Sequence, residues 1–206
     1  MSIPVITISR EYGSGGRAIG EKLAKELGIP FYNKELILMA AKESGLSEEY
    51  IKKAEQQKST SFLYGLYMGA QQLPMNDQIF LIQSKIIREI AEKGPCVIVG
   101  RCADYVLDGT ENLVRLFVYA EIEERINKVR EKGYFPEEDI LKNIKRIDRE
   151  RRDYYRYYTG KSWENLENYD LMINTTKLSY DDMVECVVDY LKMRGILANR
   201  GKYDRI

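Results

Sequence analysis

The chain changes repeatedly between short apolar runs and longer stretches of helical periodicity. The short runs are rich in β-branched and other apolar residues and stop at glycine or at polar residues, which predicts buried strands. They lie at residues 3–8, 29–32, 96–99, 113–119 and 169–174. We expect the run at 29–32, which contains a proline, to be a brief strand at the edge of the sheet.

The longer stretches carry apolar residues three or four positions apart, which predicts amphipathic helices. They lie at residues 19–27, 34–58, 78–93, 121–132, 137–158 and 179–193, with a break at 45–47 in the second. Residues 59–75 fit neither pattern, and we expect a mobile insert there. Because helices alternate with strands, the sequence predicts an α/β fold with a parallel sheet covered on both faces.

The composition is that of a folded domain and restricts its partners. A length of 206 residues suits one large domain, and 44% hydrophobic with 31% charged residues is ordinary globular usage. The 32 basic and 32 acidic side chains cancel. A chain without net charge has no bulk attraction for polymeric nucleic acid or an anionic membrane, so any anion site must be local.

The residue types also exclude several kinds of chemistry. There is no histidine, which removes histidine bases and histidine metal ligands. The three cysteines, Cys96, Cys102 and Cys186, lack the spacing of a zinc site, and we predict no protein metal site. The chain has no apolar stretch of about 18 residues and does not begin with a signal sequence, so we expect a cytoplasmic protein with no membrane partner.

A glycine-rich loop joins the first predicted strand to the first predicted helix. Gly13, Ser14, Gly15 and Gly16 stand where backbone N–H groups and the helix N-terminus can converge on an anion. Arg17 follows at the rim and can reach phosphate oxygens. The composition and position of the loop favour a phosphate site over the alternative, a purely structural turn.

The loop differs from the known nucleotide-binding patterns. In the pattern G-x-x-x-x-G-K-[ST], either Gly16 stands in place of the lysine, or Arg17 replaces the lysine and Ala18 the hydroxyl residue. Neither register supplies the hydroxyl that normally binds Mg²⁺. The dinucleotide pattern G-x-G-x-x-G is disfavoured because Ala18 stands at its third glycine and the nearest acid, Glu35, lies beyond the next strand.

Arginines recur where a phosphate could be bound. Arg101 follows the strand at 96–99, so we expect it at the same sheet edge as the glycine loop, the alternative being a salt bridge to Asp104. Further along, one helical face carries three arginines and an acid: Arg149, Arg152, Asp153 and Arg156. Such a face predicts either an anion-binding surface or a solvated helix with pairs such as Asp148 with Arg152.

Taken in order, these segments resemble the cytidylate kinase-like family of P-loop nucleoside monophosphate kinases. The first strand and its loop, the strand ending in Gly100-Arg101, the arginine run at 149–156 and the final strand at 169–176 match that family. The GSGGR loop indicates a divergent subgroup. The resemblance implies a three-layer P-loop kinase fold with a parallel five-stranded sheet, helices on both faces, an acceptor-binding insert and a helical lid.

The resemblance also implies an organisation and a set of roles. It implies one domain over residues 1–206, with a core at 1–34, 78–135 and 168–195, an insert at about 35–77 and a lid at about 136–167. Arg101 would hold the acceptor phosphate, Asp153 would touch the acceptor sugar, and Arg149 and Arg156 would clamp the transferred phosphates. We expect Arg152 to act with them, so that its loss lowers turnover more than affinity.

The predicted function is ATP-dependent phosphoryl transfer to a nucleoside monophosphate. ATP with Mg²⁺ would be the donor, bound by the glycine loop and Arg17, and the protein would be a monomer or a homodimer. Three alternatives stay open. One is a P-loop kinase for a small metabolite that is not a nucleotide, because Gly100-Arg101 is followed by Cys102 and not by an acid. The second is a sensor that binds nucleotide without transfer, because the loop lacks the hydroxyl ligand of Mg²⁺, and the third is a plain α/β interaction module.

Overall fold

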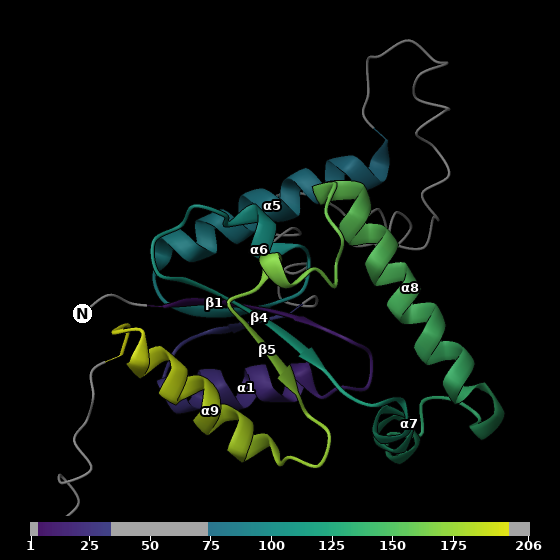
Figure 1. Cartoon of the computed structure of the whole chain (residues 1–206). Coiled ribbons are helices and arrows are strands. Elements are labelled where there is room, and N and C mark those ends of the chain that lie inside the picture. The colour runs from purple at the N-terminus through teal and green to yellow at the C-terminus, as the bar shows by residue number, and fades with distance from the viewer. Residues whose placement is uncertain (1–3, 34–73, 198–206) are drawn as a thin grey trace, which may run out of the picture.

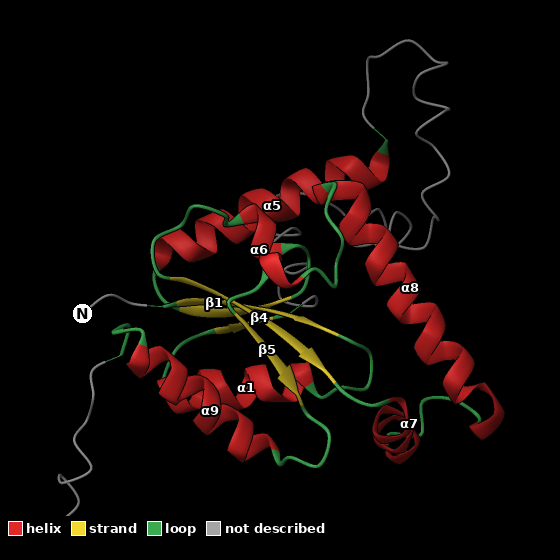
Figure 2. Ribbon diagram, in the orientation of Figure 1, coloured by secondary structure: helices red, strands yellow, loops and turns green. Residues whose placement is uncertain are grey.

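The computed structural model describes residues 4–33 and 74–197 (Figures 1 and 2). Within these ranges it contains a five-stranded sheet in the order β2-β3-β1-β4-β5, and all neighbouring strands run parallel. The strands are β1 Val5–Arg10, β2 Phe31–Tyr32, β3 Cys96–Val99, β4 Leu113–Tyr119 and β5 Leu171–Asn174. The prediction of a parallel five-stranded sheet is confirmed. The predicted helix at 34–58 and most of the predicted insert lie outside the described residues.

Helices cover both faces of the sheet, as predicted (Figure 1). On one face α1 (Gly16–Leu27) and α9 (Tyr180–Met193) pack on Ile6, Ile8 and Val118. On the other face α5 (Met75–Lys93) and the short α6 (Ala103–Val106) cover Val5 and Ile98. Burial of these apolar side chains on the two faces is what holds the three layers together.

Two further helices stand beside the sheet. The helix α7 (Ile122–Glu131) follows β4, and α8 (Ile140–Thr159) follows a 3₁₀ turn at Glu137–Asp139. Figure 1 shows α8 running from beside α7 to the N-terminal start of α5, where the Tyr158 hydroxyl donates to Asp77. Ile140 and Ile144 pack against Val129 of α7, while Tyr155 packs with Trp163 and with Phe117 of β4. The predicted lid helix is therefore anchored by an apolar cluster at each end.

Some observed boundaries differ from the predicted ones for local reasons. The helix α1 begins at Gly16 and not at residue 19, because its first turn is built from backbone and carries no apolar periodicity. The strand β1 extends to Arg10, which pairs with Val118 of β4. At α9 the helix begins after Ser179, whose side chain accepts from the N–H of Asp182 in a capping box. Among the described helices, none combines the length and the apolar composition needed to cross a bilayer.

Candidate active site

The glycine loop is held in a conformation that requires glycine at two positions. Gly13 and Gly15 have φ of 83° and 86°, and Gly15 caps the start of α1. A Cβ on Gly15 would lie 2.5 Å from the ring of Tyr180, and one on Gly13 would lie 2.9 Å from the carbonyl oxygen of Arg125. The loop is thus packed on α7 and α9, and the first N–H groups of α1, which by helix geometry have no acceptor within the helix, lie where an anion can bind.

The side chains of the loop do not all face that site. Ser14 is buried, its hydroxyl donates to the carbonyl of Glu11 at 2.9 Å, and its own carbonyl accepts from Thr175 at 2.8 Å. Ser14 can therefore offer only backbone to a phosphate. The side chain of Arg17 is 60% exposed and its Nε donates to Oε1 of Glu21 at 3.0 Å, one turn further along α1.

A cavity of about 300 Å³, here called the edge cavity, lies where β1 and β3 end beneath α8. Three arginines line it, Arg10, Arg101 and Arg151, together with the rings of Tyr154, Tyr155 and Trp163. Its remaining described lining residues are Ser9, Val99, Gly100, Cys102, Ile147 and Glu150. The side chain of Glu150, its only acidic lining residue among these, pairs with Arg146 at 2.7 Å. The edge cavity is therefore positively charged and suited to an anion.

The turn after β3 has an unusual backbone conformation at Arg101 and its neighbours. Gly100, Arg101 and Cys102 have successive φ angles of 83°, 58° and 53°. Positive φ at a residue other than glycine costs about 1–3 kcal/mol and is concentrated at functional sites. The guanidinium of Arg101 lies 5.8 Å from the centre of the Tyr154 ring of α8. Because β1 and β3 are parallel neighbours, the glycine loop after β1 and the turn that carries Arg101 after β3 lie at the same edge of the sheet, as expected.

Arg151 joins α8 to the end of β1. Its Nη1 donates to the carbonyl oxygen of Arg10 at 2.7 Å, and its guanidinium lies 5.5 Å from the centre of the Tyr12 ring. Burial lowers the pKa of Arg151 from its ordinary value, and the charge of Asp148, 4.0 Å away, opposes that effect. Because burial disfavours the charged form of Arg151, a bound anion would stabilise that charge.

The predicted face of α8 is divided by the structure. Arg149 and Arg152 line a second cavity, of about 620 Å³, between α7 and α8, and Arg152 pairs with Glu164 at 2.8 Å. Asp153 and Arg156 are exposed and line neither of these cavities. The four side chains therefore do not reach the edge cavity in this structure, and their roles stay predictions. The inward positions of α8 are Ile144, Asp148, Arg151 and Tyr155, and the same helical spacing is visible in the sequence.

A buried ion network ties the glycine loop to α7 and α8. Arg125 is buried, donates from Nε to the carbonyl oxygen of Tyr12 at 2.7 Å, and pairs with Glu11 at 3.1 Å and with Asp148. Oδ1 of Asp148 also accepts from the backbone N–H of Tyr12 at 2.7 Å. The predicted pairing of Asp148 with Arg152 is wrong, because Asp148 points inward to Arg125 while Arg152 points outward.

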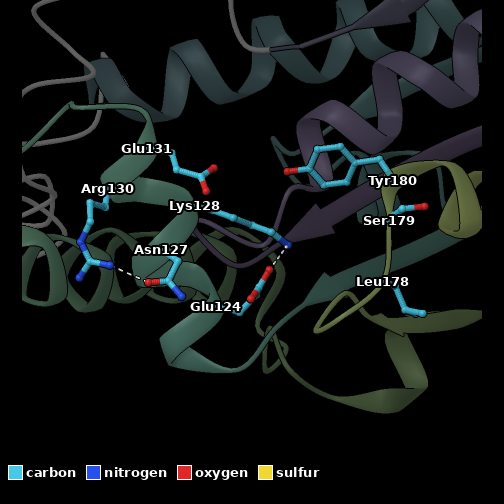
Figure 3. A pocket seen from close by; sticks show the side chains of 8 residues that line it. All are labelled: Glu124, Asn127, Lys128, Arg130, Glu131, Leu178, Ser179 and Tyr180. Carbon is cyan, nitrogen blue, oxygen red and sulfur yellow. Dashed lines mark hydrogen bonds and ion pairs between the residues drawn. The ribbon is translucent and has the colours of Figure 1, made fainter.

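A third cavity, of about 540 Å³, opens beside the loop between α7 and residues 178–180 (Figure 3). Figure 3 shows Lys128 between Glu124 and Tyr180. Nζ of Lys128 is 3.3 Å from Glu124 and 5.5 Å from the centre of the Tyr180 ring. Since Tyr180 also covers Gly15, this loop-side cavity adjoins the glycine loop directly.

The described residues around the edge cavity offer neither a reactive thiol nor a metal site. Burial raises the pKa of the Cys102 thiol, which keeps it protonated and unreactive. Among the residues that the structure describes, no group of three or more cysteines and acidic residues could hold a metal ion. The arrangement can bind and orient anions, and nucleophilic catalysis by a side chain has no support from it.

One buried acid beside the cavity predicts a pH dependence of stability. The Tyr155 hydroxyl donates to Oδ2 of Asp104 at 2.7 Å, and burial raises the pKa of Asp104 above its ordinary value. A carboxyl with a higher pKa in the folded than in the unfolded protein lets the folded state bind more protons. Its contribution to stability is therefore lost as the pH rises from the ordinary carboxyl pKa through the raised one.

Asp104→Asn is expected to remove the loss of stability that the ionisation of Asp104 causes as the pH rises. The free energy of unfolding by urea, measured for both proteins between about pH 4 and pH 7, is the test. The wild type should lose more stability than Asp104→Asn as the pH rises. Parallel curves would show that Asp104 titrates alike in both states.

Comparisons with known proteins agree with this geometry. A model of the cytidylate kinase-like family matches residues 5–177. A cytidylate kinase from Pyrococcus horikoshii is 29% identical over 91% of this chain and 89% of its own length, and one from Methanopyrus kandleri is 26% identical over 86% and 88%.

Solved structures show the same fold. An uncharacterised protein from Eubacterium ventriosum superposes with a TM-score of 0.72 at 27% identity, covering 92% of this chain and 98% of that one. A shikimate kinase from Acinetobacter baumannii, at 12% identity and a TM-score of 0.50 over 95% and 96%, is alike in fold alone. Together with the family match over most of its length, this shows that the chain belongs to the cytidylate kinase-like family.

Proposed function

We propose that the protein transfers a phosphoryl group from ATP to a nucleoside monophosphate in the cytoplasm. The observation that carries the proposal is the edge cavity, because it brings Arg101 to the glycine-loop end of the sheet with two more arginines. Phosphoryl transfer requires alignment and charge neutralisation more than a reactive side chain. A site rich in guanidinium groups and without histidine supplies both.

The residues present fit the phosphates of ATP. The N–H groups from Gly13 to Gly16 would hold the donor phosphates, where a side chain on Gly13 or Gly15 would collide with α7 or Tyr180. The loop-side cavity, next to Gly15, would take the nucleoside part of the donor. ATP would supply the γ-phosphoryl group, and Mg²⁺ would be held by phosphate oxygens and water, since Arg17 or Ala18 stands in place of the hydroxyl ligand.

On the acceptor side, Arg101 would fix the nucleoside monophosphate. Its phosphate oxygen is already anionic, so attack on the γ-phosphorus needs no general base: one P–O bond forms, and the bond to ADP breaks. The aromatic walls of the edge cavity, among them Tyr155 and Trp163, keep water from competing with the acceptor. The roles predicted for Arg17, Arg149, Arg152, Asp153 and Arg156 require a rearrangement of their side chains or of α8, and they stay predictions.

The test is transfer from MgATP to CMP, dCMP and UMP, with AMP, GMP and small hydroxylated metabolites as comparisons. Formation of a nucleoside diphosphate, followed by ³¹P NMR or anion-exchange chromatography, supports the proposal. Transfer only to a metabolite supports the non-nucleotide kinase, and ATP bound without consumption on any acceptor supports the sensor.

Arg101→Ala is expected to raise KM for the accepted nucleotide while KM for ATP changes little. A charge-assisted hydrogen bond to phosphate contributes about 1.5–3 kcal/mol, which corresponds to roughly 10- to 150-fold in acceptor affinity. Arg88→Ala, which removes an exposed guanidinium from α5 outside the three cavities, is the matched control. Steady-state kinetics with each substrate varied separately measure the effect, and equal losses for both substrates would contradict it.

A further inference from the structure

The structure decides between the two ways of aligning the glycine loop with the pattern G-x-x-x-x-G-K-[ST]. The helix α1 begins at Gly16, directly after its cap Gly15, while the side chain of Arg17 points along the outside of α1 to Glu21. Gly15 is therefore the second glycine of the pattern and Gly16 stands where the lysine belongs. Counting back five positions, Arg10 stands where the pattern has its first glycine.

The side chain missing from position 16 and the side chain added at position 10 would occupy the same space. A Cβ built on Gly16 would lie 2.6 Å from the Cβ and 3.0 Å from the Cγ of Arg10. Real Cβ atoms do not approach other carbons so closely, because van der Waals repulsion is steep at that distance. A lysine at 16 and an arginine at 10 therefore exclude each other, and this chain has the arginine.

The side chain of Arg10 passes from Gly16, next to the glycine loop, to Gly100, next to Arg101. It lines the edge cavity with Arg101 and Arg151, and a Cβ on Gly100 would overlap its Nη1. Gly16 at the foot of Arg10 and Gly100 at its tip are thus both without a side chain where the arginine passes. Arg151 donates to the carbonyl oxygen of Arg10 at 2.7 Å and fixes the backbone from which the side chain leaves.

We propose that Arg10 supplies the cationic contact to the transferred phosphoryl group that a lysine at the start of the helix supplies in the usual loop, so that positions 10 and 16 have exchanged their cation and their glycine. The inference rests on the proposed function. The guanidinium, standing between the glycine loop and Arg101, donates to phosphate oxygens on the donor side. It thereby makes up for the lysine that the sequence lacks at position 16.

The exchange can be reversed experimentally. The variants are Arg10→Gly, Gly16→Lys and the double variant Arg10→Gly/Gly16→Lys, with Arg88→Ala as the control for loss of one positive charge. Binding of MgATP and of inorganic tripolyphosphate is measured by titration calorimetry without any acceptor, and thermal unfolding shows that each variant is folded. The triphosphate probe isolates the phosphate site from the nucleoside.

Arg10→Gly is expected to weaken binding of both probes roughly 10- to 150-fold, as for loss of one charge-assisted hydrogen bond. The double variant should recover most of this loss, while Gly16→Lys alone should unfold at a lower temperature, because its side chain meets Arg10. Unchanged binding by Arg10→Gly would overturn the inference, and so would a folded double variant that binds no better than Arg10→Gly.

The same measurements distinguish failure of the proposed function from failure of the role proposed for Arg10. A wild type that binds ATP but phosphorylates no nucleotide contradicts the proposed function alone, since the Arg10 comparison depends only on binding. A wild type that binds neither ATP nor tripolyphosphate overturns both.

Discussion

Replacing Asp148 by alanine is expected to lower the free energy of unfolding by about 3–5 kcal/mol, the usual effect of removing one partner of a buried ion pair. Arg125 would keep its charge in a buried position with Glu11 as its remaining described acidic partner. The backbone N–H of Tyr12 would lose its acceptor as well. Because this network holds the start of the glycine loop against α7 and α8, ATP affinity should fall together with stability.

Urea unfolding of Asp148→Ala measures the effect, and an exposed pair between α8 and the turn that follows it provides the control. Glu164→Ala removes the partner of Arg152, where both side chains are close to half exposed. Exposed pairs contribute about 0.2–1 kcal/mol, because water screens them and the side chains lose entropy when they pair. Similar losses from Asp148→Ala and Glu164→Ala would show that the buried network does not anchor α8.

The layers of the fold and the position of the glycine loop were predictable because buried strands appear in the sequence as apolar runs. Ile6, Ile8, Val97 and Val99 are almost completely buried, and runs of such residues cannot remain in water. Parallel strands bring their carboxyl ends to one edge, so the presence of the glycine loop and Arg101 at the same edge followed from the parallel arrangement. The family resemblance added the order of the later elements.

The inner face of α8 and the part of Arg10 were not predictable in the same way. The charged face at 149, 152, 153 and 156 was conspicuous, but charge alone does not say which side of a helix faces the protein. The apolar positions Ile144 and Tyr155 do, and they place Arg151 inward, next to Asp148. Arg10 lay beyond the predicted strand at 3–8, and the path of its side chain past Gly100 depends on a contact between segments 90 residues apart.

Neighbouring arginines on α8 give the sharpest test of which face meets the substrate. Arg151→Ala is expected to lower kcat/KM by roughly 10- to 150-fold, because it removes a half-buried cation from the edge cavity and its bond to the carbonyl of Arg10. Arg152→Ala removes the same group one residue later, on a side chain paired with Glu164, and the geometry favours a much smaller loss.

Comparing Arg151→Ala with Arg152→Ala shows whether α8 acts in the position described or moves during turnover. If α8 moves during turnover, Arg152 and its face at 149 and 156 would reach the phosphates, and Arg152→Ala would lower kcat with little change in KM. If the described arrangement is the reactive one, it is Arg151→Ala that should lower kcat with little change in KM. Arg151→Lys refines the reading, since a lysine keeps the charge but not the forked hydrogen bonds that join the Arg10 carbonyl and an anion at once. Recovery by lysine would assign Arg151 an electrostatic role, and failure to recover would assign it the positioning of β1 against α8.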